Sequence, residues 1–207
     1  MLKLHFLFVV LTVNLSSSLV FAAQLEQHNW QNELIAAAIA RTNQQVTYSG
    51  EYRAIDYPNG DVPNNIGVCT DVVIRSYRQL GVDLQQLVHE DMRENFSLYP
   101  AIWGLTKPDP NIDHRRVPNL QMFFQRFALS LPPSNQISDY LPGDLVTWML
   151  PGNLPHIGIV SNQKNSEDGN WLIIHNIGRG PKMEDFLFSA PITGQYRFST
   201  PLPSPSP

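Results

Sequence analysis

Cysteine is almost absent from this chain, which has 207 residues and a single cysteine, Cys69. One thiol cannot form a disulfide within its own chain, so the sequence excludes a fold stapled by internal disulfides. Basic clusters are also absent, since charged residues make up only 15% of the chain and the formal net charge is −4. Nucleic-acid-binding surfaces concentrate lysine and arginine, so we expect no nucleic-acid partner.

Motifs for metals and phosphates are absent as well. Cys69, His156 and His175 are suitable zinc ligands by type, but they lack the short paired spacing of zinc motifs. The segment VHEDM at residues 88–92 has no second histidine at the zincin spacing, and residues 56–65 lack the spacing of a calcium loop. No glycine-rich phosphate loop follows a predicted strand. We therefore expect no metal and no cofactor.

The first 22 residues are predicted to be a secretory signal peptide, with Lys3 ahead of an apolar core at residues 6–15. The apolar stretch is short for a stable membrane anchor, although an uncleaved membrane helix is the alternative. We expect export across the inner membrane to the periplasm, without a stable membrane anchor after cleavage. A single domain is predicted over residues 23–199, and residues 200–207 form a Pro/Ser tail that we expect to be disordered.

Helical spacing of apolar residues is confined to the first two thirds of the chain. It predicts four helices, within residues 24–45, 69–80, 84–92 and 117–127. After Leu131 the pattern changes to short runs rich in β-branched residues, such as DLVTWML, HIGIVSN and WLIIHNI. This order predicts an α+β domain, with N-terminal helices packed on a C-terminal antiparallel β-sheet.

Cys69 lies where the turn-rich loop at residues 57–65 gives way to a predicted helix. The positive end of the helix dipole and the unpaired N–H groups there lower a thiol pKa and can bind an oxyanion. Cys69 also shares a helical face with Val72 and Val73, which suits a small buried apolar residue. Both interpretations, nucleophile and structural thiol, are open at this point.

Two histidines are candidate bases for such a nucleophile. His156 and His175 lie in predicted strands joined by a polar turn at residues 162–170, so neighbouring strands would place the two imidazoles side by side. A single histidine is more often structural. A cysteine at a helix start followed by two strand histidines is more specific, because it has the order of papain-like cysteine chemistry.

Three segments resemble NlpC-type cell-wall cysteine peptidases. GVCTDVVIRSYRQLG resembles the segment that begins at their nucleophile, LPGDLVTWMLPGNLPHIGIVSN resembles the strands carrying the catalytic histidine, and WLIIHNIGRG resembles the next strand. The phrases YPNGDVP, VHEDM, IDHRRVPNL and HNIG resemble a narrower bacterial family, numbered 1287 among domains of unknown function, over roughly residues 35–198.

The peptidase resemblance implies a papain-like, NlpC-type α+β fold and a set of residue roles. Cys69 would be the nucleophile and His156 its base, and His175 would orient the His156 ring. Asn176 is the alternative for that third role, because neighbouring residues of a strand face opposite sides. Asp71 departs from the usual Ser-Gly pair, and its charge would oppose thiolate formation or bind a substrate amine.

Three further residues are candidates for substrate binding. Tyr57 would stabilise an oxyanion, with a packed structural turn as its alternative role. Arg115 and Arg116 would bind a substrate carboxylate, with a solvated helix entry as the alternative.

These observations predict an exported cysteine hydrolase that cleaves an amide or peptide bond through a Cys69 acyl-enzyme. Peptidoglycan stem peptides are the expected substrate and partner. A non-catalytic domain that binds wall peptides and a thiol acyltransferase using the same residues are the alternatives. Hydrolysis and transfer share the acyl-enzyme, so the sequence does not separate them.

Overall fold

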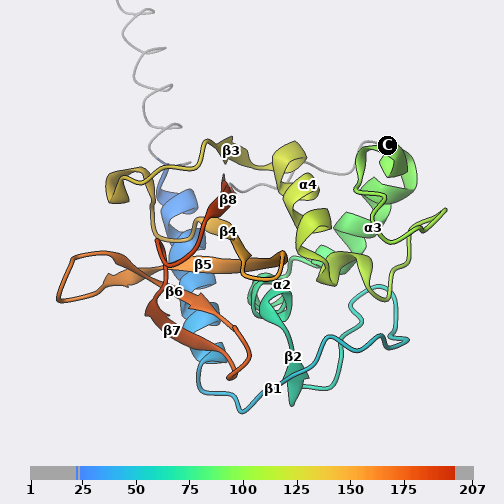
Figure 1. Cartoon of the computed structure of the whole chain (residues 1–207), viewed down its shortest axis with the longest axis horizontal. Coiled ribbons are helices and arrows are strands. Elements are labelled where there is room, and N and C mark those ends of the chain that lie inside the picture. The colour runs from blue at the N-terminus through green and yellow to red at the C-terminus, as the bar shows by residue number, and fades with distance from the viewer. Residues whose placement is uncertain (1–21, 23, 199–207) are drawn as a thin grey trace, which may run out of the picture.

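The computed structural model describes residue 22 and residues 24–198 (Figure 1). The predicted signal peptide, apart from Ala22, and the predicted C-terminal tail lie outside the described residues. In the part of the chain that is described, no helix is long and apolar enough to cross a membrane. The molecule has helices on one side of an antiparallel sheet, so the predicted α+β class is confirmed.

The helices form close to the predicted positions. A helix over residues 24–41 is followed by α2 (Cys69–Gln79), α3 (Leu84–Asn95) and α4 (Val117–Phe127). Asp83 caps α3, because its side chain accepts a hydrogen bond from the Gln85 N–H at 3.0 Å. Three short 3₁₀ turns, η1 (Phe96–Leu98), η2 (Asp113–Arg115) and η3 (Ile137–Asp139), connect the longer elements.

The main sheet has six strands in the order β3-β8-β4-β5-β6-β7, and all of its neighbouring strands are antiparallel. Its strands are β3 (Leu129–Leu131), β4 (Leu145–Leu150), β5 (Leu154–Lys164), β6 (Trp171–His175), β7 (Lys182–Asp185) and β8 (Ile192–Arg197). A separate parallel pair joins β1 (Thr47–Tyr48) to β2 (Ile66–Gly67), just before α2.

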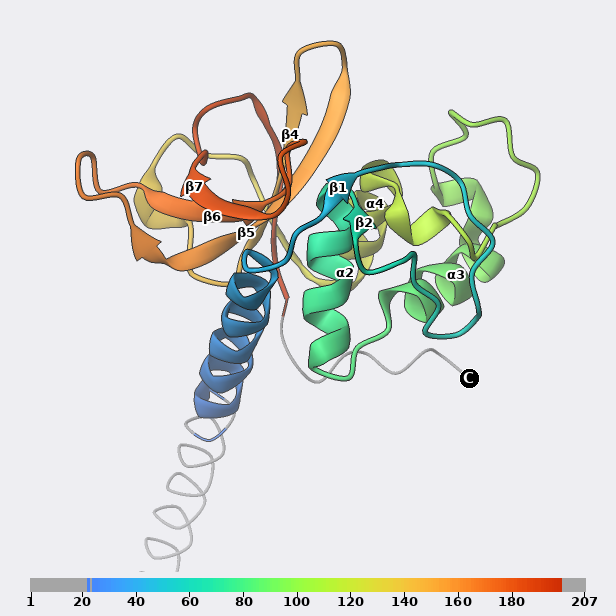
Figure 2. The same cartoon turned by 90° about the horizontal axis from the view of Figure 1, so that it is seen from below.

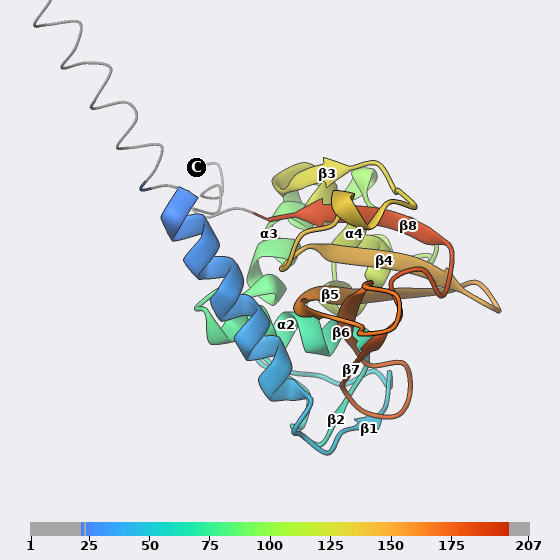
Figure 3. The same cartoon turned by 90° about the vertical axis from the view of Figure 1, so that its left-hand side faces the viewer.

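Helix α2 lies between the sheet and α3 (Figure 2), while the N-terminal helix runs along the sheet and α2 (Figure 3). The larger apolar core joins α2, α4 and the N-terminal helix to side chains such as Ile157, Ile159 and Ile174. A smaller core on the opposite sheet face contains Val160 and Ile173. Side chains of a strand alternate between faces, so consecutive residues of β5 and β6 belong to different cores.

Candidate active site

Cys69 is the first residue of α2, and its side chain is only 4% exposed. It packs in the larger core, as its spacing relative to Val72 and Val73 predicts. Three hydrogen-bond donors act on the thiol and favour its thiolate: the backbone N–H groups of Ile157 and Thr70 and the Tyr48 hydroxyl. The thiol therefore lies where the start of α2 meets β5 and β1.

Burial raises the pKa of the Cys69 thiol to about 11, and the nearby charge of Asp71 acts in the same direction. The donors from Ile157, Thr70 and Tyr48 lower the pKa, but by less than burial raises it. The helix start was expected to favour a thiolate, and this structure instead favours the neutral thiol. Loss of water from around the sulfur outweighs the local dipoles.

Asp71 is engaged inside the protein rather than presented to a substrate. Its Oδ2 accepts a hydrogen bond from the Val68 N–H at 2.6 Å, and Arg115 donates from Nε and Nη2 to its two carboxylate oxygens, each at 2.8 Å. Both side chains of the pair are buried. Neither residue is therefore free, in this structure, for the substrate amine or carboxylate expected from the sequence. The pair instead fixes the start of α2 to η2.

His156 in β5 and His175 in β6 lie side by side, with His156 Nε2 at 2.7 Å from His175 Nδ1. His175 Nε2 in turn lies 3.0 Å from Oε1 of Glu184 in β7. As a carboxylate, Glu184 can only accept, so His175 donates from Nε2 and its Nδ1 accepts from His156. This assignment follows from the hydrogen-bond network, and it leaves Nδ1 of His156 as a proton acceptor.

Both imidazoles are neutral because they are buried. Burial lowers the pKa of His156 to about 3, with a further contribution from His175, and lowers the pKa of His175 to about 4. The Phe186 ring packs against both, with centroid distances of 5.7 Å to His156 and 4.5 Å to His175. Trp148 contacts His156 from β4 at 5.8 Å.

The thiol and the histidine rings lie in different surroundings beside β5. The side chains of His156 and His175 face Trp148 and Phe186, whereas Ile157 faces the core that holds Cys69. However, the backbone N–H acting on the thiol belongs to the peptide bond between His156 and Ile157. Within the described residues, no hydrogen bond joins Cys69 Sγ to the His156 ring. The thiol thus adjoins the backbone of His156 while the imidazole turns toward His175.

Asn176 lies on the Cys69 side of the sheet, where its Nδ2 donates to the Gly67 carbonyl oxygen at 3.5 Å. It therefore links the end of β6 to β2. Two residues were candidates for orienting the His156 ring, and His175 is the one that forms a hydrogen bond with it.

Tyr57 and Arg116 occupy other parts of the surface. Tyr57 is 41% exposed, and its ring packs edge-on against His89 at 5.0 Å. Arg116 pairs with Asp113 at 3.2 Å and stacks over Trp103 at 4.2 Å. In the described part of the chain, neither makes a hydrogen bond or ring contact with Cys69, His156 or His175.

Two residues of the site were missed from the sequence, Tyr48 and Glu184. Tyr48 approaches Cys69 because β1 pairs with β2 in a register that sets Tyr48 opposite Gly67, two residues before Cys69. A strand of two residues has no usable periodicity. Glu184 lies in KMED, a strand with only one apolar residue, and its histidine partner depends on the pairing of β6 with β7.

A polar cleft of about 570 Å³ lies beside the β1–β2 pair. Its lining includes Thr47, which precedes Tyr48, together with Asn65 and the basic residues Arg179 and Lys182. Among the residues that the structure describes, neither Arg179 nor Lys182 forms a salt bridge, and no group of three or more His, Cys, Asp or Glu side chains is arranged to hold a metal ion. The cleft therefore offers positive charge close to the residues around the thiol.

Comparisons with known proteins give a family model, a curated relative and a solved structure. A family model described as DUF1287, a domain of unknown function, matches residues 35–198. The curated protein YijF of Escherichia coli (strain K12), described as uncharacterized, is 52% identical over 151 residues, which are 73% of each chain. The structure of NlpC1 from Trichomonas vaginalis aligns with a TM-score of 0.43 and 12% identity. That alignment covers 82% of this chain but only 44% of NlpC1.

Proposed function

This chain belongs to the DUF1287 family, and we propose that it is a cysteine hydrolase that cleaves an amide or peptide bond. One observation carries the proposal: the hydrogen-bonded series Glu184–His175–His156 ends beside the backbone group that contacts the Cys69 thiol. Such a series holds an imidazole in one tautomer and stabilises its protonated form, as a catalytic base requires.

The proposed reaction begins when Cys69 Sγ attacks the substrate carbonyl carbon and its proton passes to His156 Nδ1. As the tetrahedral intermediate collapses, the C–N bond breaks and His156 returns the proton to the leaving amine. A water molecule then gives a proton to His156 and attacks the thioester carbon. The C–S bond breaks, the acid product leaves, and the proton returns to the sulfur.

Backbone N–H groups at the start of α2 are proposed to bind the oxyanion, because the first turn of a helix leaves such groups without intrahelical partners. Tyr48 is a second candidate donor, since its hydroxyl already acts on the Cys69 thiol. This role replaces the one expected for Tyr57, which packs on His89.

Peptidoglycan stem peptides are the proposed substrate. They carry carboxylates that Arg179 and Lys182 in the polar cleft would bind, and their amide bonds suit the acyl-enzyme chemistry. Periplasmic location, which this substrate requires, remains a prediction from the first 22 residues.

Catalysis by this route requires the site to open. Cys69 is only 4% exposed, and Tyr48 lies against it. We propose that substrate entry shifts the Tyr48 side chain from the thiol toward the substrate carbonyl, turns the His156 ring toward the thiol and admits water. Since burial is the main cause of the raised thiol pKa, opening would lower that pKa toward its ordinary value.

A non-catalytic peptide-binding domain is the second candidate, and the buried, neutral thiol favours it. Incubation of purified peptidoglycan with the wild type, Cys69→Ala and His156→Ala, followed by mass spectrometry of the soluble fragments, separates the two. We expect new fragments from the wild type and none from either variant. Binding without fragments from any of the three would support the second candidate, and equal release by Cys69→Ala would refute a thiol mechanism.

A further inference from the structure

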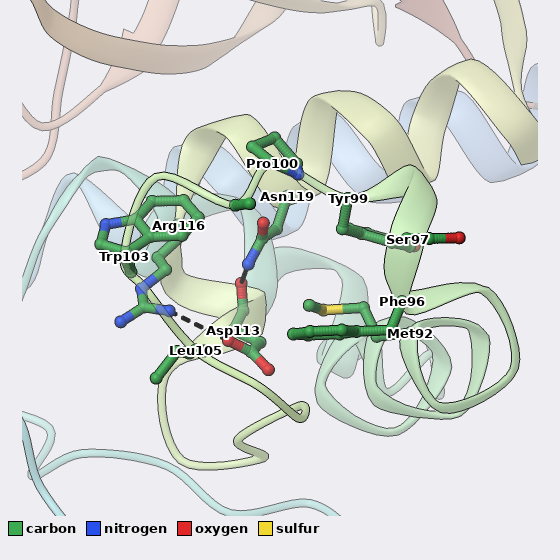
Figure 4. A pocket seen from close by; sticks show the side chains of 11 residues that line it. Met92, Phe96, Ser97, Tyr99, Pro100, Trp103, Leu105, Asp113, Arg116 and Asn119 are labelled. Carbon is green, nitrogen blue, oxygen red and sulfur yellow. Dashed lines mark hydrogen bonds and ion pairs between the residues drawn. The ribbon is translucent and has the colours of Figure 1, made fainter.

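A second, smaller cavity lies among the helices, away from the sheet that carries His156 and His175 (Figure 4). Its volume is about 240 Å³, and it is bounded by α3, η1, η2, the start of α4 and the loop between η1 and η2. Most of its wall is apolar and is made by Met92, Phe96, Tyr99, Trp103 and Leu105. The cavity is therefore shaped for a small ligand with an apolar part.

Asn119 holds an unpartnered hydrogen-bond acceptor within the wall of this cavity, where neighbouring atoms cover it. The residue is fully buried, and its Nδ2 donates to the Asp113 carbonyl oxygen at 3.1 Å, which fixes the orientation of the amide. Its Oδ1 is buried without a hydrogen-bond partner among the described residues. A buried carbonyl oxygen is costly when left unpaired, so a ligand with an N–H donor at this point would gain from pairing with it.

Arg116 supplies positive charge on the same cavity. Its guanidinium lies 4.2 Å from the centre of the Trp103 ring and donates one hydrogen bond, from Nη1 to Asp113 Oδ1 at 3.2 Å. A guanidinium has five N–H donors, so Arg116 has further donors for which the described residues show no hydrogen bond. Figure 4 shows Arg116 and Trp103 at one side of the cavity and Asn119 close to Asp113.

We propose that this cavity binds an amino-acid residue that carries a free carboxylate, an acylated α-nitrogen and an apolar side chain. The carboxylate would pair with Arg116 and the side chain would fill the apolar space. The amide N–H would pair with Oδ1 of Asn119 once the loop between η1 and η2 shifts to uncover that oxygen. An acylated nitrogen fits better than a free ammonium group, because the available acceptor is one neutral oxygen and Asp113 already faces Arg116. The proposal does not depend on the chemistry of Cys69.

The chemistry fits two sources, a free N-acyl amino acid and the C-terminal residue of a peptide. Calorimetric titration of the full chain would use N-acetyl-leucine and glycyl-glycyl-leucine as the two probes. Three control compounds each lack one recognised group. Leucine lacks the acyl group, N-acetyl-leucinamide lacks the carboxylate, and N-acetyl-N-methyl-leucine lacks the N–H donor. We expect one site for the acylated acids and at least tenfold weaker binding of these three. The tighter of the two probes identifies the source.

Two variants test the location. Arg116→Gln should weaken binding at least tenfold, whereas Arg93→Gln, on an exposed arginine outside the cavity, should leave it unchanged. Ala101→Phe should abolish binding by filling the cavity from its exposed rim without removing any hydrogen bond. Equal binding by Arg116→Gln and by Ala101→Phe, or no binding of either acylated acid at millimolar concentration, would overturn the proposal.

Discussion

At the scale of single residues, the environment of Cys69 decides how the candidate site is interpreted. The sequence shows a thiol at a helix start, which favours a thiolate, with a carboxylate two residues later. It does not show that Arg115, 44 positions away, pairs with Asp71, and it leaves burial of the thiol as one of two interpretations. In the closed structure, desolvation is the largest effect on the thiol pKa. Helical spacing offered burial as one of two interpretations, but the sequence could not show how strongly burial would act on the thiol pKa.

The first prediction concerns the reactivity of this thiol. With a pKa of about 11, roughly one thiol in ten thousand is ionised at pH 7, so alkylation by iodoacetamide should be slow. Its rate should rise about tenfold per pH unit from pH 7 to 10. The measurement is the rate of mass increase at each pH, with urea-unfolded protein as the reference. A rate that levels off below pH 8 in the folded protein would show a stabilised thiolate instead.

At the scale of elements, the register between β5 and β6 brings the histidines together. Ile159 pairs with Ile174 and Val160 with Ile173, so Gly158 and His175 share a face with His156. A Cβ on Gly158 would lie 2.7 Å from Ile173 Cγ2 and 3.1 Å from His175 Cβ. Glycine therefore permits the close approach of the two strands beside the imidazole pair.

We expect Gly158→Ala to push β6 away from β5 and to destabilise the protein by about 1–3 kcal/mol through overpacking. It should also weaken the hydrogen bond between His156 and His175. Urea unfolding measures the first effect, and the ring ¹⁵N shifts of the two histidines measure the second. The matched control is Gly50→Ala, whose Cβ would meet Val68 Cγ1 at an ordinary 3.6 Å. If the two variants behaved alike, tight packing at Gly158 would be disproved.

The order of elements was predictable because period and composition change together near Leu131, and the proximity of His156 and His175 followed from the turn between them. The parallel β1–β2 pair was not predictable, because each strand has only two residues. For the same reason the sequence points to Tyr57 and gives no sign of Tyr48. Contacts between segments far apart in the sequence were the main features that could not be predicted, since local periodicity carries no information about them.

At the scale of the whole molecule, stability depends on keeping buried histidines neutral. Burial lowers the pKa of His156 and of His114 to about 3 and that of His175 to about 4. In the unfolded chain each would titrate near 6.5. The unfolded state then binds more protons below about pH 6.5, so the free energy of unfolding should fall as the pH falls through that value.

We therefore expect stability to decrease between pH 7 and pH 4.5, a range in which most carboxylates remain ionised. Each neutral buried histidine should contribute up to about 1.4 kcal/mol per pH unit. Urea unfolding at several pH values measures the slope, and His114→Gln, outside the His156–His175 pair, should make it shallower. A free energy of unfolding that stays constant over this range would show that these histidines titrate normally in the folded state.

The central claim is that Cys69 forms an acyl-enzyme with His156 as its base. Its most direct test is intact-protein mass spectrometry after brief incubation with peptidoglycan fragments and an acid quench, followed by peptide mapping. We predict a covalent acyl adduct on Cys69 in the wild type, much less adduct in His156→Ala, and none in Cys69→Ala. Release of cleaved fragments by Cys69→Ala at the wild-type rate would contradict the account, as would the absence of any adduct and any cleavage in the wild type.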